Sequence, residues 1–372
     1  MGQRRLAKHR LLRQSQPKRA AICSLSARTY RCLFSFHVVW PGPGDELDHS
    51  TTICTCVEAG DLETEVLLLA ESLRKFGGRW AGVPMIAVKA RRGPSLATAT
   101  VKRLEQLDVQ LVDKLLNDEA PWWDHANKAA AIRYVEQHAS TRCVTWMDGD
   151  MVVLREPEEF APVQGTEFIA RAAEGYDVAS SGSDNKADYW RRICAVFGLR
   201  FEEFADILSW PDNKRIKAYW QSGIFTYIRE KNLGARFYEV FATMLRTPIA
   251  SKFAGTFHTD QVSLALAVQL LKLRCSQYGP RMNFNYNPID RERASLIPLA
   301  DVSVLHYHSS LLPVHYGWAR EGFKALSADQ FKLIDSHAPL RRSSIPVRLQ
   351  RKLLKMWRKR KLNAFEARVV KY

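Results

Sequence analysis

The 372-residue sequence lacks several features that mark well-defined protein classes. Its seven cysteines form no facing Cys-x-x-Cys pairs, so they indicate neither a zinc framework nor an evident disulfide set. No apolar run reaches the roughly 20 residues that a membrane-spanning helix needs. The apolar run at 32–40 is too short and too late for a tidy signal peptide. We therefore expect a protein of a reducing compartment, cytoplasmic and without a transmembrane helix.

Two common nucleotide-binding signatures are also missing. No Gly-x-Gly-x-x-Gly follows the first predicted strand, and no Walker lysine loop occurs anywhere in the sequence. The sequence contains no internal repeats either. These absences exclude a simple dinucleotide-binding or P-loop protein and a repeat architecture.

Positive charge is abundant but unevenly distributed. The net charge is +16, yet residues 1–44 hold nine Lys or Arg and no acid, and residues 341–372 hold twelve and only Glu366. The remainder carries 34 basic and 38 acidic residues, so the body is slightly acidic. We predict a basic, disordered N-terminal extension at 1–48, a catalytic domain at 49–330 and a basic tail at 331–372.

The C-terminal tail has the pattern of an amphipathic helix. Leu349, Leu353, Met356 and Trp357 recur at helical spacing. Basic residues fall largely between them: Arg351, Lys352, Lys355, Arg358 and Lys359. We favour attachment to an anionic membrane surface, peripherally on its inner face. An apolar stripe packed on the body and a nucleic-acid-binding tail remain alternatives.

The most informative segment reads CVTWMDGDMVVL. An apolar run at 143–147 precedes Asp148, Gly149 and Asp150, and a second apolar run follows at 151–154. This pattern predicts a buried strand with two carboxylates at its end, which in open α/β sheets is where ligands bind. Hard divalent cations prefer such oxygen ligands and often share them with phosphates. Gly149 would keep side-chain atoms away from the cation, although Asp and Gly are also ordinary turn residues.

The body alternates predicted strands and helices, which indicates an α/β fold with a mostly parallel sheet flanked by helices. Strands are predicted at 51–57, 83–90, 109–112, 143–147, 167–172 and from 223, and helices at 62–76 and 127–138.

Polar residues mark the ends of several later elements. Asp260 and Gln261 begin a predicted helix, where Asp260 can also serve as a simple cap. His306 and His308 share one face of a late strand and offer metal ligands. Lys128, at the start of the helix before the DGD strand, could contact phosphates or remain a solvated helix lysine.

The ordered set of segments resembles a known family. CTCVEAG, MDGDMVVL, QSGIFTYI, TDQVSLALA and VLHYHSS follow one another between about residues 50 and 325. In that order they resemble the motifs of GT-A-fold glycosyltransferases, closest to glycosyltransferase family 8 and its relatives. Two departures occur: Gln221 replaces an Asn, and a Lys-Pro-Trp after the late His is absent. The resemblance implies a GT-A-like, Rossmann-type sheet.

The resemblance also implies a function and a set of site residues. It implies a hexosyltransferase-like enzyme that uses Mn²⁺ or Mg²⁺, takes a nucleotide-sugar donor, usually a UDP-sugar, and retains anomeric configuration. The acceptor would be a glycan or lipid-linked. Asp148, Asp150, His306 and His308 would be metal ligands, and Asp260 and Gln261 would lie beside the anomeric carbon. The donor-binding set would be Cys56, Val57, Glu58, Lys128, Asp148, Gly149, Asp150, Gln221, Ser222 and Gly223.

Two other functions fit parts of the sequence. Asp148-Gly-Asp150-Met-Val152 also matches the haloacid-dehalogenase-type phosphatase pattern, with Asp148 as nucleophile, although several strand–helix units precede it. A non-enzymatic, basic nucleic-acid-binding protein is the other alternative, and the acidic body argues against it. Trp122 and Trp123 are the aromatic pair most worth testing at the acceptor or donor edge.

Overall fold

The computed structural model describes residues 50–158, 160–175, 178–340 and 345–372. The predicted N-terminal extension at 1–48 lies outside these residues. Within them, a central sheet has the strand order β11-β6-β9-β4-β1-β2-β3. Its strands are β1 (Thr51–Cys56), β2 (Met85–Lys89), β3 (Val109–Asp113), β4 (Cys143–Met147), β6 (Phe168–Ala172), β9 (Trp220–Ile228) and β11 (Cys275–Gln277).

The central sheet is mostly parallel, as the sequence predicts. Only the two pairings of β9, with β4 and with β6, are antiparallel among its described neighbours. In β4 every residue is buried, and alternate residues enter different cores: Val144 and Trp146 one, Cys143 and Met147 the other. Burial on both faces explains why this strand reads as a continuous apolar run.

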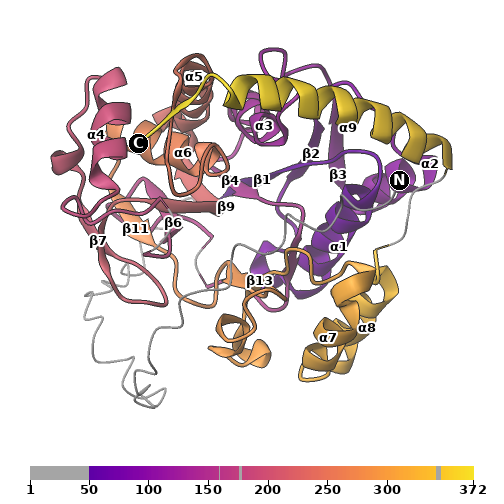
Figure 1. Cartoon of the computed structure of the whole chain (residues 1–372). Helices are drawn as coiled ribbons and strands as arrows, with labels where there is room; N and C mark the ends of the chain where they lie inside the picture. The colour runs from indigo at the N-terminus through magenta and orange to yellow at the C-terminus, as the bar shows by residue number, and fades with distance from the viewer. Residues whose placement is uncertain (1–49, 159, 176–177, 341–344) are drawn as a thin grey trace, which may run out of the picture. The chain divides into compact units, whose positions relative to one another are not determined.

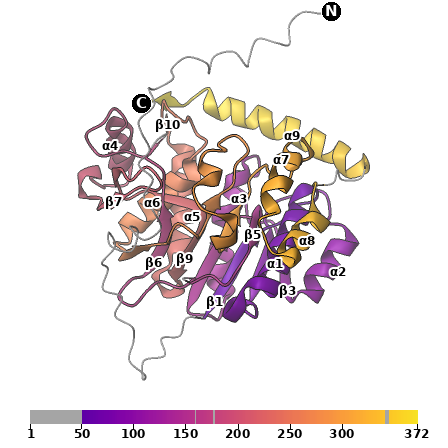
Figure 2. The same cartoon turned by 90° about the horizontal axis from the view of Figure 1, so that it is seen from below.

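Helices cover both faces of the sheet (Figure 1; Figure 2). One face packs against α3 (Asp124–His138), α5 (Leu233–Arg246) and α6 (Thr259–Leu270). The other packs against α1 (Asp61–Phe76) and α2 (Thr98–Gln106). The arrangement confirms the predicted α/β class with flanking helices.

A second, three-stranded sheet carries the end of the DGD segment. It has the order β12-β13-β5, formed by β12 (Phe284–Asn285), β13 (Val304–His306) and β5 (Met151–Val153). β5 and β13 are antiparallel, and Met151 pairs with His306. This register places His306 next to Asp150, although the two residues are more than 150 positions apart in the sequence.

The remaining elements lie around these two sheets. The helices are α4 (Ala187–Val196), α7 (Pro313–Phe323) and α8 (Ala328–His337), and the short strands are β7 (Asp206–Leu208), β8 (Arg215–Lys217), β10 (Ile249–Ala250) and β14 (Val370–Lys371). No helix among the described residues has the length and apolar character needed to cross a membrane.

The basic tail forms one long helix, α9 (Ile345–Glu366), as its periodicity predicts. It belongs to the same compact unit as the sheets, residues 48–372. Phe365 is its buried residue and contacts the rings of Trp122 and Trp123. After α9, β14 pairs with β10. The tryptophan pair therefore serves as the anchor for α9.

Candidate active site

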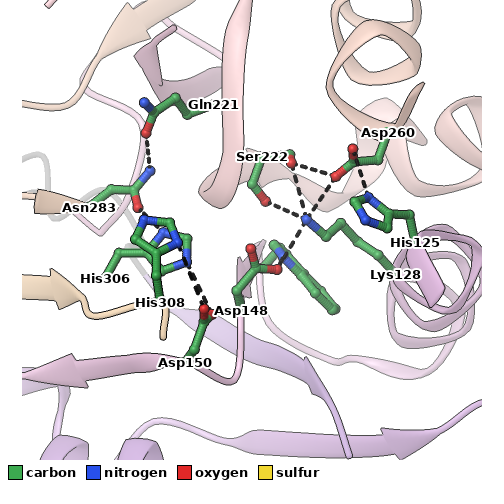
Figure 3. Close-up of polar contacts among 11 residues, drawn as sticks. His125, Lys128, Asp148, Asp150, Gln221, Ser222, Asp260, Asn283, His306 and His308 are labelled. Atoms are coloured by element: carbon green, nitrogen blue, oxygen red, sulfur yellow. Dashed lines mark hydrogen bonds and ion pairs between the residues drawn. The ribbon is translucent and has the colours of Figure 1, made fainter. Parts of the chain in front are cut away.

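Polar side chains from both sheets meet where β4 ends (Figure 3). They form two groups with Asp148 between them. The carboxylate–histidine cluster contains Asp150, His306 and His308. The Lys128 cluster contains Lys128, Ser222, Asp260 and His125.

The carboxylate–histidine cluster has the geometry of an ion-binding site. The ligand atoms of its three residues all lie within 4.8 Å of one another. His306 Nε2 is 3.1 Å from Asp150 Oδ1, and His308 Nδ1 is 4.0 Å from Asp150 Oδ2. The two imidazole rings stack with centroids 3.8 Å apart. Three side chains that share one focus can hold a divalent cation.

Backbone conformation contributes to this geometry. The strand β13 ends at His306, and His308 has a φ of 49°, in the left-handed region that non-glycine residues seldom adopt. The left-handed turn replaces the regular strand predicted through His308, yet both rings still face Asp150. Such strain persists where surrounding contacts enforce it, and it is common at functional sites.

Two amide side chains orient His306. Asn283 donates through Nδ2 to Gln221 Oε1 at 2.8 Å, and its Oδ1 lies 3.0 Å from His306 Nδ1. This chain of bonds makes His306 Nδ1 a donor and turns Nε2 toward Asp150. Asn285 lies 3.3 Å from His308 Nε2 in the same way. Gln221, predicted as a donor contact, thus also supports a metal-ligand candidate.

Charges within the cluster shift the pKa values of its members in different directions: Asp150 and Asp148 outweigh burial and raise the pKa of His306. Burial alone would raise the pKa of Asp150, but His306 and His308 outweigh it and hold that pKa below its ordinary value. Burial, followed by the neighbouring His306, lowers the pKa of His308 to about 3. His308 is therefore neutral near pH 7, which is the form in which imidazole binds metals.

Lys128, Ser222 and Asp260 of the Lys128 cluster are buried, and His125 is partly exposed. Lys128 Nζ lies 3.0 Å from Asp260 Oδ2, 3.0 Å from Asp148 Oδ1 and 3.0 Å from the Ser222 carbonyl oxygen. Ser222 Oγ donates to Asp260 at 2.6 Å, and His125 Nδ1 is 3.0 Å from Asp260 Oδ1. A solvated role for Lys128 is therefore wrong. The capping role for Asp260 is also wrong, because its carboxylate binds side chains instead.

Mutual attraction keeps this cluster ionised. Burial would lower the pKa of Lys128, but Asp148 and Asp260 outweigh it and raise that pKa. Burial would likewise raise the pKa of Asp260, yet Lys128 and His125 hold it well below its ordinary value. The site thus contains a fixed ammonium ion beside two carboxylates.

Asp148 and Gly149 take roles that differ in part from those expected. Asp148 accepts from Trp146 Nε1 at 2.8 Å and pairs with Lys128, and it lies outside the three-residue ligand cluster. Its role as a metal ligand stays a prediction. A Cβ on Gly149 would come within 2.9 Å of Leu62 on α1. Its small size therefore leaves room for helix packing, and the expectation that it also spares room for the cation stays a prediction.

Gly223 lies directly against the carboxylate–histidine cluster. A Cβ at this position would lie 3.0 Å from both His306 Cε1 and Asn283 Oδ1. Its carbonyl also accepts from the Asp148 amide at 2.8 Å. Glycine is needed here because β9 passes directly against the carboxylate–histidine cluster.

The end of β1 forms the neighbouring part of the site. Glu58 pairs with Arg91, accepts from Asn127 Nδ2 at 2.8 Å and lies 3.6 Å from Arg358 of α9. Cys56 is partly buried there, whereas the Val57 side chain is fully buried. Any donor contact from Val57 would therefore involve its backbone.

The structure brings together most of the predicted site residues. Gln261, next to Asp260 in sequence, is partly buried and belongs to neither cluster. His125, Asn283 and Asn285 join the site without having been predicted. The MNFNYN segment that holds both asparagines has no recognisable motif, and His125 gave only one weak signal, its place in the helix that carries Lys128.

Comparison with known proteins identifies the family. A family model described as "Rhodobacterales glycosyltransferase domain" matches residues 53–272, which is more than half of the chain. The chain belongs to this glycosyltransferase family. The matched region includes most of β1, the DGD segment, Lys128 and Asp260, but ends before His306. Membership favours glycosyl transfer over the phosphatase and over a non-enzymatic role. The likeness to family 8 in particular stays a prediction.

A solved structure resembles this glycosyltransferase more distantly. The chain is similar to the structure titled "WbbM bifunctional glycosytransferase apo structure", with 12% identity and a TM-score of 0.44. The similarity covers 78% of this chain and 52% of that one, so the chain spans about half the length of WbbM. No curated protein matches the sequence.

Proposed function

We propose that this glycosyltransferase transfers a sugar from a nucleotide diphosphate sugar in a metal-dependent reaction. The observation that carries the proposal is the convergence of Asp150, His306 and His308 on one point beside the buried Lys128–Asp260 pair. A cation site next to a fixed ammonium ion suits a donor that carries two phosphates. Family membership supplies the reaction class.

The ligand atoms of the carboxylate–histidine cluster suit Mn²⁺. Carboxylates suit Mg²⁺ and Mn²⁺, while imidazoles suit the transition metals, and Mn²⁺ accepts both. Asp150, His306 and His308 would hold the ion, and Asp148 would join them after a change of partner. When bound, the metal would act as a Lewis acid that neutralises charge on the departing diphosphate.

The Lys128 cluster would act on the donor sugar and its phosphates. Lys128 is held protonated by two carboxylates, so it can attract phosphate oxygens without a change of protonation. Asp260 fixes Lys128 and His125 in place, and a carboxylate at that position would stabilise an oxocarbenium-like centre. Gln261 is the adjacent candidate for the same region.

The finer assignments follow from the resemblance of the motifs. We propose a UDP-sugar donor bound near Cys56, Val57 and Glu58, transfer with retention, and a glycan or lipid-linked acceptor. Glu58 supports the donor assignment because its carboxylate, just after β1, accepts from Asn127, the residue before Lys128 in α3.

The test is release of UDP or GDP from a panel of nucleotide sugars, with Mn²⁺, with Mg²⁺ and with EDTA. We expect Mn²⁺-dependent donor hydrolysis that falls at least 100-fold in Asp150→Asn and in His306→Gln. Asp188→Asn is the matched control, because it removes a carboxylate from an exposed pair with Arg192 on α4. Turnover of a generic phosphatase substrate, lost in Asp148→Asn and without any donor hydrolysis, would overturn the proposal.

A further inference from the structure

The helix α9 contacts the body through two arginines and a phenylalanine. Arg351 lies 3.8 Å from Asp61, Arg358 lies 3.6 Å from Glu58, and Phe365 is buried against the tryptophan pair. These residues are spaced by seven, so they share one side of the helix. The inner side of α9 therefore combines charged contacts, to Asp61 and Glu58, with an apolar contact to the tryptophan pair.

From Ile345 to Trp357 the opposite side of α9 is apolar and exposed, and Arg360 follows on the same side in the later turns. At 100° per residue, Leu349, Leu353 and Met356 lie roughly opposite the inner side, and Trp357 lies at their edge. Their exposed fractions are 59%, 68%, 58% and 43%. We call these four residues, together with Ile345, the α9 apolar stripe. The α9 apolar stripe does not pack on the body. The alternative interpretation of the tail, a helix whose apolar stripe packs on the body, is therefore wrong.

Lysines border the α9 apolar stripe. Lys352, Lys355 and Lys359 lie along one flank, between the apolar stripe and the inner side, and all three are exposed. The helix holds eight Lys or Arg in all, and Glu366 at its last position is its single acid. Long lysine stems can lie along an apolar surface while their charges remain in water.

We propose that α9 docks on an anionic phospholipid bilayer through the α9 apolar stripe, with the flanking lysines on the lipid headgroups. An exposed apolar stripe with a cationic border and a tryptophan at the edge has the chemistry of an interfacial helix. A nucleic acid would contact the lysines but leave the leucines exposed. The α9 apolar stripe faces solvent while the inner side of the helix stays in contact with the body.

Docking would also bring the candidate active site near the membrane. Arg358 lies 3.6 Å from Glu58, a predicted donor-binding residue, and Glu58 accepts from Asn127, the residue before Lys128 in α3. If the proposed function holds, the acceptor would be lipid-linked or presented at the bilayer surface. The docking itself requires no sugar transfer and can be tested without it.

The experiment is co-sedimentation of the full chain with vesicles of phosphatidylcholine alone or with 30% phosphatidylglycerol. We expect binding to the anionic vesicles only, reduced at least tenfold by Leu353→Glu with Met356→Glu. Ile289→Glu and Val314→Glu are the matched controls, because these exposed residues, at 83% and 79%, lie outside α9. Replacing Lys352, Lys355 and Lys359 together by Gln should also weaken binding, since it removes three headgroup contacts.

A second measurement locates the contact. Brominated lipids should quench tryptophan fluorescence in the natural chain and much less in Trp357→Phe. Donor hydrolysis without vesicles should be unchanged in Leu353→Glu/Met356→Glu, which separates this proposal from the proposed function. Unchanged vesicle binding by that variant would overturn the docking. The docking would also be overturned if that variant kept vesicle binding but lost dimer formation or an RNA mobility shift.

Discussion

At the scale of single residues, the site depends on side chains that position other side chains. His306 is oriented by Asn283, which is held by Gln221, and Gly223 leaves the space that both His306 and Asn283 occupy. Partners of this kind commonly change metal affinity by 10- to 100-fold when removed. The carboxylate–histidine cluster should therefore be sensitive to changes that leave all three ligand candidates intact.

Gly223→Ala tests this dependence. The new methyl group would lie 3.0 Å from His306 Cε1 and Asn283 Oδ1, so both side chains must shift by a few tenths of an ångström. We expect Mn²⁺ affinity, measured by calorimetry, to fall about tenfold with the fold retained. Gly317→Ala is the control, because a Cβ there meets no atom within 4 Å. Equal Mn²⁺ affinity in both variants would contradict the role given to Gly223.

Glu65 on α1 offers a prediction about pH. Burial, with a smaller contribution from Asp150, raises its pKa to about 8. In the unfolded chain the carboxyl would ionise near its ordinary value, so the natural protein loses stability as pH rises from about 4.5 to 8. Glu65→Gln removes this loss, and at pH 8 it should raise the free energy of unfolding by about 1–3 kcal/mol.

Urea denaturation of Glu65→Gln and the natural chain at pH 5 and pH 8 gives the comparison. The difference in stability should be small at pH 5 and larger at pH 8. Glu105→Gln, an exposed change on α2, should show no such trend. A difference independent of pH would mean that Glu65 is ionised in the folded protein.

At the scale of elements, the strands and helices of the body were predictable because their sequences combine periodicity with clear ends. The helix α1, for example, has Asp61 and Glu63 in its first turn and Arg74 and Lys75 in its last. The pairing of β5 with β13 was not predictable, because three-residue strands carry little periodicity and lie far apart in sequence. Asn283 and His125 were missed for the same reason, since they join the site through tertiary contacts.

Attachment of α9 leads to a prediction at this scale. Phe365 is the buried residue of the helix, whereas Arg351 and Arg358 form partly exposed ion pairs that contribute little. Phe365→Ala should weaken the attachment by about 3 kcal/mol. Amides of α9 should then exchange hydrogen faster, while those of β1 and β4 keep their protection.

Hydrogen exchange read by mass spectrometry resolves the two regions. Leu353→Ala is the matched control, because that side chain points away from the body and is 68% exposed. Faster exchange throughout the sheet in Phe365→Ala would show instead that α9 and the body unfold together.

At the scale of the whole molecule, the excess positive charge and the candidate active site belong to different parts of the sequence. The excess positive charge lies in the two terminal segments, and the body that holds the candidate active site is slightly acidic. Within that body, acidic and basic groups are paired around the ends of β1 and β4. The whole-chain pI of about 9.6 thus describes the terminal segments and not the site.

The proposed activity depends on one cation bound by Asp150, His306 and His308 and shared with a nucleotide diphosphate. The most direct test is titration calorimetry of the full chain with Mn²⁺, followed by UDP with and without the metal. We predict one Mn²⁺ per chain, lost in Asp150→Asn, and UDP binding that requires the ion. Tight UDP binding in EDTA, or Mn²⁺ binding that survives Asp150→Asn unchanged, would contradict it.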